Sequence, residues 1–269
     1  MRVLRWLIIT LCAVLCACND SGGGLPASSS RPYEVTVVGN GNDSLKKILS
    51  QSVEGLPQEE PMFDVTVRKQ LDKWSKLSRA IVIYQQGTTM SMEQNEWARP
   101  QIIIHTDGSD PQRLLRTLNA FEMAEQVKTL RRSHNDRAAK TIKKMFGINM
   151  LVPAELKSSM VRKNFIWYSN NTPQGMKNII VTRGDVNVMI GRNIKGETDS
   201  MFMRLVDDRQ ERGLWEMEGD AMGGPYVMKH VGDVSIIAFV YAPESKKRNL
   251  MRQLEAALYT INKTKNNGK

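Results

Sequence analysis

Cysteine is almost absent from this chain, because Cys12, Cys16 and Cys18 all lie within its first eighteen residues. Residues 19–269 therefore cannot contain a disulfide, a thiol nucleophile, an iron–sulfur cluster or a cysteine zinc site. The fold must be stabilised by an ordinary hydrophobic core instead. A chain of 269 residues with 41% apolar residues is large enough to form one or two such cores.

The apolar run at the N-terminus is too short to span a bilayer. Arg2 and Arg5 give a basic start, and residues 6–17 form an apolar segment of the size of a signal-peptide core. The tail Leu15-Cys16-Ala17-Cys18 resembles a bacterial lipobox, in which the cysteine is lipidated before cleavage on its N-terminal side. We therefore expect residues 1–17 to be a lipoprotein signal peptide and Cys18 to be the lipidated residue. An uncleaved anchor and an ordinary secretory signal are the alternatives.

Lipidation at Cys18 predicts attachment to the cell envelope. A single acyl chain holds a protein only marginally, whereas the two or three chains of a bacterial lipoprotein hold it stably. Asn19 is not the aspartate associated with inner-membrane retention in enteric bacteria. The residues that follow lack the acidic cluster linked with surface display. We therefore expect the protein on the periplasmic face of the outer membrane.

The remaining chain divides into a linker and a folded part. Residues 18–32 are rich in Gly, Ser and Pro and poor in apolar residues, which is typical of a flexible tether. Residues 33–269 are expected to form the globular domain. A buried strand followed by a Leu-rich helix occurs twice, which suggests two similar halves at 33–147 and 148–269. The other interpretation is that any strand followed by an amphipathic helix gives this pattern.

Acidic residues are fewer than basic ones, and the formal net charge is +10. This excess favours anionic partners in the envelope, such as lipid headgroups, an acidic protein or another anionic ligand. A solvated basic surface is the simpler interpretation. We do not expect a nucleic-acid partner, because the chain has no recognition-helix or aromatic-basic motif.

Hydrophobic periodicity predicts strands and helices in alternation. The expected strands are 33–38, 63–67, 80–84, 102–104, 148–152, 164–168, 178–182, 226–231 and 234–241. The expected helices are 43–49, 71–77, 110–147 with a break near 133–136, 198–208 and 250–261. This order predicts an α+β fold with a mostly antiparallel sheet and helices packed on one face.

No catalytic motif is present, since the chain lacks a nucleophile elbow, an H-E-x-x-H pair, a phosphate-binding loop and a dinucleotide fingerprint. The densest local pattern is residues 212–226. In an extended conformation Glu216, Glu218 and Asp220 would point to the same side, where they could bind a cation or serve as acid and base. These three are the candidate ligand-binding residues. The simpler interpretation is a solvated strand face before a glycine-rich bend, and no metal or other cofactor is expected.

Several segments resemble a family of Bacteroidetes cell-envelope lipoproteins known only as a domain of unknown function. The segments are residues 56–63, 97–101, 144–153, 164–167, 212–227 and 239–259. The resemblance implies an envelope location and supplies no activity, cofactor or catalytic residue. We therefore expect a non-catalytic binding or interaction module. The alternative is an envelope hydrolase or glycan-processing enzyme that uses the clustered carboxylates.

Overall fold

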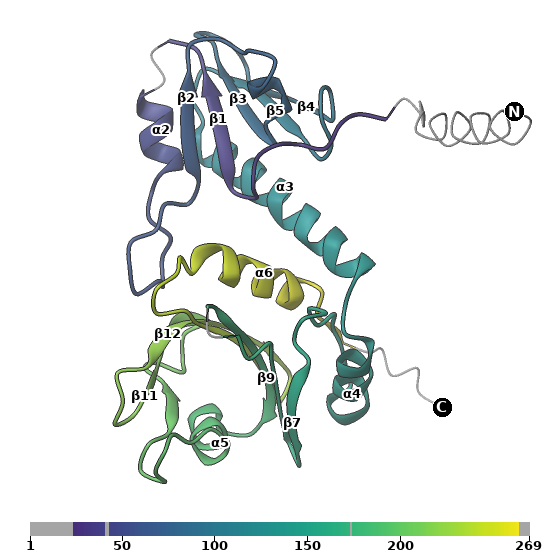
Figure 1. The fold of residues 1–269 in the computed structure, drawn as a ribbon, viewed down its shortest axis with the longest axis vertical. Coiled ribbons are helices and arrows are strands. Elements are labelled where there is room, and N and C mark those ends of the chain that lie inside the picture. The colour runs from purple at the N-terminus through teal and green to yellow at the C-terminus, as the bar shows by residue number, and fades with distance from the viewer. Residues whose placement is uncertain (1–23, 41–42, 173, 264–269) are drawn as a thin grey trace, which may run out of the picture.

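The structure is a computed structural model that describes residues 24–40, 43–172 and 174–263. A smaller and a larger β-sheet lie at opposite ends of the molecule, and two helices lie between them (Figure 1). These helices are α3 (Pro111–Arg132) and α6 (Arg248–Tyr259). Cys18 and the expected signal peptide lie outside the described residues.

The smaller sheet has the strand order β2-β1-β3-β5-β4. Its strands are β1 (Glu34–Val38), β2 (Asp64–Arg68), β3 (Ala80–Tyr84), β4 (Ser91–Gln94) and β5 (Ile102–Thr106). All pairings are parallel except that of β4 with β5. Helix α2 (Asp43–Leu49) and α3 pack on one face, where Val37, Ile104 and Leu118 are fully buried or nearly so. A short 3-10 helix, η1 (Ser75–Leu77), lies between β2 and β3.

Local capping signals set the ends of the central helices. Asp110 caps α3 by accepting a hydrogen bond from the Arg113 amide at 2.9 Å. The chain then breaks, and Asn135 caps α4 (Asp136–Phe146) in the same way through Ala138. Gly147 ends α4 in the left-handed conformation at φ 71°. The predicted break near residues 133–136 is confirmed.

The larger sheet is antiparallel throughout and has the order β10-β11-β12-β13-β9-β8-β7. Its strands are β7 (Ser158–Arg162), β8 (Phe165–Ser169), β9 (Met176–Arg183), β10 (Met203–Leu205), β11 (Arg212–Met217), β12 (Gly223–Val231) and β13 (Val234–Tyr241). Helices α4 and α6 cover one face, and α5 (Val186–Asn193) covers the other. The two-residue strands β6 (Ile148–Asn149) and β14 (Asn262–Lys263) pair with each other.

The predicted α+β class is confirmed. The prediction was a mostly antiparallel sheet. The larger sheet is antiparallel, whereas the smaller sheet is mainly parallel. Helices occupy one face of the smaller sheet and both faces of the larger one. The division into halves at 147 and 148 stays a prediction.

The predicted helix at 198–208 is wrong. This segment contains strand β10, and Met203 and Leu205 point into the core of the larger sheet while Arg204 between them is exposed. The two-residue alternation is that of a strand with one solvated face.

Candidate functional site

Glu216 and Glu218, two of the predicted ligand-binding residues, share a single arginine. Glu216 lies near the end of β11, and Glu218 follows it in the turn to β12. Arg204 on the neighbouring strand β10 forms an ion pair with Glu216, and its Nε lies 3.1 Å from Glu218 Oε2. Asp220 is exposed in the same turn. Both glutamates are therefore ion-paired with Arg204, which offsets one of their two negative charges, and they do not form a free acidic cluster.

These acids also do not form a metal site. Over residues 24–40, 43–172 and 174–263, no three or more His, Cys, Asp or Glu side chains lie close enough to hold a metal ion. The same residues include no helix long and apolar enough to cross a membrane.

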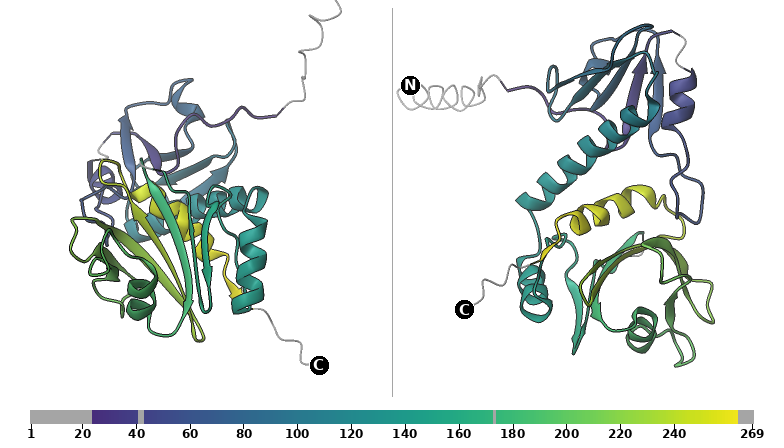
Figure 2. Two further views of the ribbon diagram at one scale, coloured as in Figure 1. Left: turned by 60° about the horizontal axis from the view of Figure 1, so that its bottom comes forward. Right: turned by 180° about the vertical axis from the view of Figure 1, so that it is seen from behind.

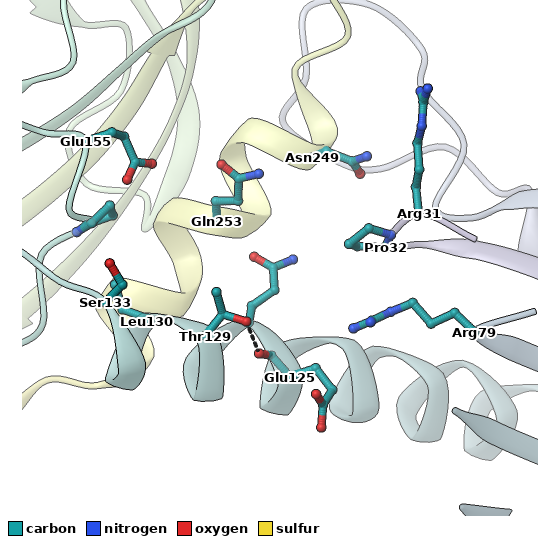
Figure 3. Close-up of a pocket in the computed structure, with 12 residues that line it drawn as sticks. Arg31, Pro32, Arg79, Glu125, Thr129, Leu130, Ser133, Glu155, Asn249 and Gln253 are labelled. Carbon is teal, nitrogen blue, oxygen red and sulfur yellow. Dashed lines mark hydrogen bonds between the residues drawn. The ribbon is translucent and has the colours of Figure 1, made fainter. Parts of the chain in front are cut away.

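A cleft of about 380 Å³ lies between α3 and α6, and connections next to both sheets contribute to it (Figure 3). Its lining residues are Arg31, Pro32, Arg79, Glu125, Gln126, Thr129, Leu130, Ser133, Pro153, Glu155, Asn249 and Gln253. We call this space the α3–α6 cleft. Its volume is within the range of small-molecule sites, and its wall combines apolar, amide and charged side chains.

Arg79 lies at the edge of the cleft and forms a buried ion pair. Its Nε lies 3.0 Å from both carboxylate oxygens of Glu122, which is fully buried. Burial raises the pKa of Glu122, and the charge of Arg79 opposes this effect. The guanidinium of Arg79 also lies over the Phe121 ring. No described residue accepts a hydrogen bond from its two terminal nitrogens, which remain available to a ligand.

Two further groups on the cleft wall lack partners within the described part of the chain. The side-chain oxygen of Gln126 is buried and accepts no hydrogen bond. The side chain of Arg31 is exposed and has no ion-pair partner. A buried polar atom without a partner costs free energy, so it favours a ligand that supplies a donor.

The acidic side chains of the cleft form ion pairs with neighbouring lysines. Glu155 forms an ion pair with the buried Lys177, whose Nζ also donates to Gln253 Oε1 at 2.6 Å. Glu125 Oε1 lies 3.3 Å from Lys128, and its carboxylate points away from α6 (Figure 3). The unpaired charge on the cleft wall is therefore that of Arg31, and Arg79 adds the two terminal nitrogens of a guanidinium that is already paired with Glu122 through Nε.

The N-terminus of α6 is held by the opposite part of the molecule. The buried carboxylate of Glu60 accepts hydrogen bonds from the Lys247 and Arg248 amides at 2.6 and 3.0 Å. The Arg248 guanidinium, which is 2% exposed, donates to the Pro61 carbonyl at 2.6 Å and to Asp64 at 2.7 Å. These contacts fix α6, and thereby one wall of the cleft, against the smaller sheet.

A second charged cluster lies further along α6. Glu255 accepts hydrogen bonds from Arg212 at 2.5 Å and from Arg252 at 3.0 Å. Burial acts to raise the pKa of Glu255, but the charges of Arg252 and Arg212 outweigh this effect and lower it. Arg252 also lies over the buried ring of Tyr33, at 5.5 Å from its centroid.

The sequence suggested two similar halves and did not indicate which residues would line a cleft. Arg79, Gln126 and Gln253 have no motif around them, and they meet only because α3 and α6 pack together. An amphipathic pattern identifies the buried face of a helix and does not specify which polar residues at its margin face a cleft.

Comparisons with known proteins do not assign an activity. No curated protein matches the chain. A crystal structure of a protein from Bacteroides thetaiotaomicron VPI-5482 is similar over 46% of this chain and 47% of its own, with 15% sequence identity and a TM-score of 0.27. This chain thus covers about half of that protein, and a TM-score this low supports no structural argument.

Two family models match parts of the chain that overlap at residues 135–143. Residues 28–143 match a domain of unknown function, DUF8532. Residues 135–260 match another domain of unknown function, DUF4837. The chain is therefore similar, from residue 28 to residue 260, to two domain families without an assigned function.

Proposed function

We propose that this protein is a lipid-anchored binding protein of the bacterial cell envelope, on the periplasmic face of the outer membrane, and that its ligand occupies the α3–α6 cleft. The observation that carries the binding role is the set of unpaired polar groups at the cleft, namely Arg31, the terminal nitrogens of Arg79 and the Gln126 oxygen. The lipobox at Cys18 supports the envelope anchor.

The chemistry of these groups favours an anionic ligand that also donates hydrogen bonds. Arginine nitrogens match the two oxygens of a carboxylate or phosphate, and Gln126 accepts a hydrogen bond from a hydroxyl or amide. Leu130, Pro32 and Pro153 supply apolar contacts. A short acidic peptide or an acidic sugar has this combination of groups.

The hydrolase alternative requires two free carboxylates that face one substrate. Glu216 and Glu218 instead share Arg204, and neither lines the α3–α6 cleft. We therefore propose binding without turnover.

A ligand screen tests the binding site. The wild-type protein, Arg31→Gln and Gln126→Leu would be heated with a panel of acidic tripeptides, uronic acids and sugar phosphates. At a concentration a hundred times its Kd, a ligand stabilises the folded state by about 2.7 kcal/mol, which is a shift in Tm of about 5 to 10 °C for a protein of this size. We expect at least one compound to raise the Tm of the wild type and to raise that of both variants less.

Arg162→Gln is the control, because Arg162 is an exposed arginine on β7 that does not line the cleft. It should respond as the wild type does. Failure of every compound to stabilise the wild type, or equal stabilisation of all variants, would contradict the proposed site.

A further inference from the structure

A tryptophan is exposed on the smaller-sheet part of the molecule. Trp74 immediately precedes η1, and 69% of its surface is exposed. Lys73 Nζ lies 5.1 Å from the centroid of its ring. Burial in the core does not explain a large aromatic side chain in this position. Exposed tryptophan beside lysine is typical of surfaces that contact the interface region of a bilayer.

More basic and aromatic groups lie around Trp74. Lys76 Nζ lies 5.3 Å from the centroid of the half-buried Trp97, and the Gln101 side chain donates to the Lys76 carbonyl at 2.7 Å. Arg99, two residues after Trp97, is exposed. We call Lys73, Trp74, Lys76, Trp97 and Arg99 the Trp74 surface.

Two acids lie near this surface. Asp72 turns its carboxylate into its own loop, where it accepts hydrogen bonds from the Trp74 and Ser75 amides at 2.9 and 2.7 Å. Glu96 is exposed beside Trp97. The three cations of the Trp74 surface outnumber these acids, and Arg68 and Lys69 add further positive charge at the start of the same connection.

The chain that leads to Cys18 leaves the fold at the Trp74 surface. The Arg99 amide donates to the Pro26 carbonyl at 2.8 Å, the Ser28 amide donates to the Arg99 carbonyl at 3.2 Å, and the Ser29 amide donates to the Leu77 carbonyl at 2.9 Å. Residues 26–29 of the expected tether therefore lie against this surface. The described chain leaves the molecule here, beside the smaller sheet and away from the larger one (Figure 2).

These contacts limit how far the Trp74 surface can lie from a lipid at Cys18. Seven residues, 19–25, separate Cys18 from Pro26. The eight steps from Cys18 to Pro26 therefore span at most about 29 Å, the length of a fully extended chain. A domain held this closely presents to the bilayer the surface from which its tether emerges.

We propose that the Trp74 surface rests on the anionic phospholipid headgroups of the membrane in which Cys18 is anchored. The inference rests on the lipid anchor of the proposed function and adds an orientation to it. Trp74 enters the interface region, Lys73, Lys76 and Arg99 lie among the phosphates, and the larger sheet points away from the membrane.

Fluorescence quenching tests this orientation. The mature protein, purified in detergent from the cells that export it, would be reconstituted into vesicles of phosphatidylglycerol and brominated phosphatidylcholine, and flotation of the vesicles would report anchoring. We expect bromine to quench the wild-type fluorescence and Trp74→Phe to lose most of that quenching while still floating. Trp167→Phe is the control, because it removes a tryptophan of the larger sheet, and it should keep the quenching.

A charge variant gives a second measurement. Lys73→Glu combined with Lys76→Glu should lower the quenching by roughly half or more in anionic vesicles, because each lysine near such a surface contributes to binding. Lys143→Glu combined with Lys144→Glu, both exposed on α4, should leave it unchanged.

The outcomes separate the two proposals. Wild-type protein that floats without quenching, or quenching that Trp74→Phe leaves undiminished, would overturn the orientation and leave the anchor intact. Wild-type protein that does not float would overturn both the anchor and the orientation that rests on it.

Discussion

At the residue scale, the position of α6 depends most directly on the contact between the Glu60 carboxylate and the N-terminus of this helix. The helix cap residue Lys247 makes no side-chain capping bond, and Glu60 supplies the acceptor from a different part of the chain. A carboxylate at a helix N-terminus interacts favourably with both the free amides and the helix dipole.

We predict that Glu60→Ala lowers the free energy of unfolding by about 2 to 4 kcal/mol, since two hydrogen bonds to a buried charged group are lost. Glu60→Gln keeps one acceptor oxygen and should cost less. Urea unfolding measures both. The variant Glu59→Ala is the control, because it removes an exposed neighbouring carboxylate. Equal effects of Glu60→Ala and Glu59→Ala would contradict the capping role.

Glu255 leads to a prediction about pH. Arg252 and Arg212 hold its folded-state pKa below the ordinary value of 4.5, despite burial. The folded state therefore binds fewer protons than the unfolded state in acid. The stabilisation is present above pH 4.5 and is lost as the pH falls through the folded-state pKa.

We predict that Glu255→Gln is less stable than the wild type at neutral pH and loses less stability on acidification, because the substituted side chain does not titrate. Chemical unfolding between about pH 7 and about pH 3 measures this difference. Parallel stability curves for the two proteins would show that Glu255 contributes nothing to acid sensitivity.

At the element scale, local signals in the sequence predicted much of the fold. Asp110-Pro111 specified the start of α3, and Gly232-Asp233 specified the hairpin between β12 and β13. In both cases the residues that determine the structure are adjacent in the sequence. The same holds for Gly147, which ends α4.

The errors arose where structure depends on distant partners. Residues 203–205 pair with β11, and Arg204 faces Glu216 across the two strands, so the segment is a strand although a helix was predicted over 198–208. The short helix α5, at 186–193, was not predicted, because its apolar face is defined by the core beneath it. The α3–α6 cleft depends on contacts of the same long-range kind.

Gly224 is required for the close approach of two strands. A Cβ at this position would lie 2.1 Å from the Val240 carbonyl oxygen, which also accepts a hydrogen bond from the Trp215 indole at 3.1 Å. We predict that Gly224→Ala destabilises the fold by about 1 to 3 kcal/mol through this overlap. The free energy of unfolding and the near-ultraviolet signal of Trp215 should both change. A variant as stable as the wild type would contradict the close approach.

At the scale of the whole molecule, we propose a binding cleft on a domain that is anchored to the membrane. Cys18 is the proposed attachment point, and residues 19–269 contain no other thiol. We predict that Cys18→Ser either releases the protein from the membrane fraction or leaves its signal peptide uncleaved. Cell fractionation and the mass of the mature protein measure this. Mature Cys18→Ser protein that remains membrane-bound would contradict the anchor.

The cleft is lined by residues of both parts of the molecule, so the ligand that we propose would lie between α3 and α6. The exposed Thr129 on α3 lines the cleft and is suited to carry a photo-crosslinking side chain. Val188 on α5 is 53% exposed, lies on the opposite face of the larger sheet and is a matched control position.

The most direct measurement is therefore photo-crosslinking in living cells at position 129, with the mass of the protein as the readout. We predict a discrete adduct at position 129 that is absent at position 188 and is reduced when Arg31→Gln is added. No adduct at position 129, or an identical adduct at both positions, would contradict a ligand in the α3–α6 cleft.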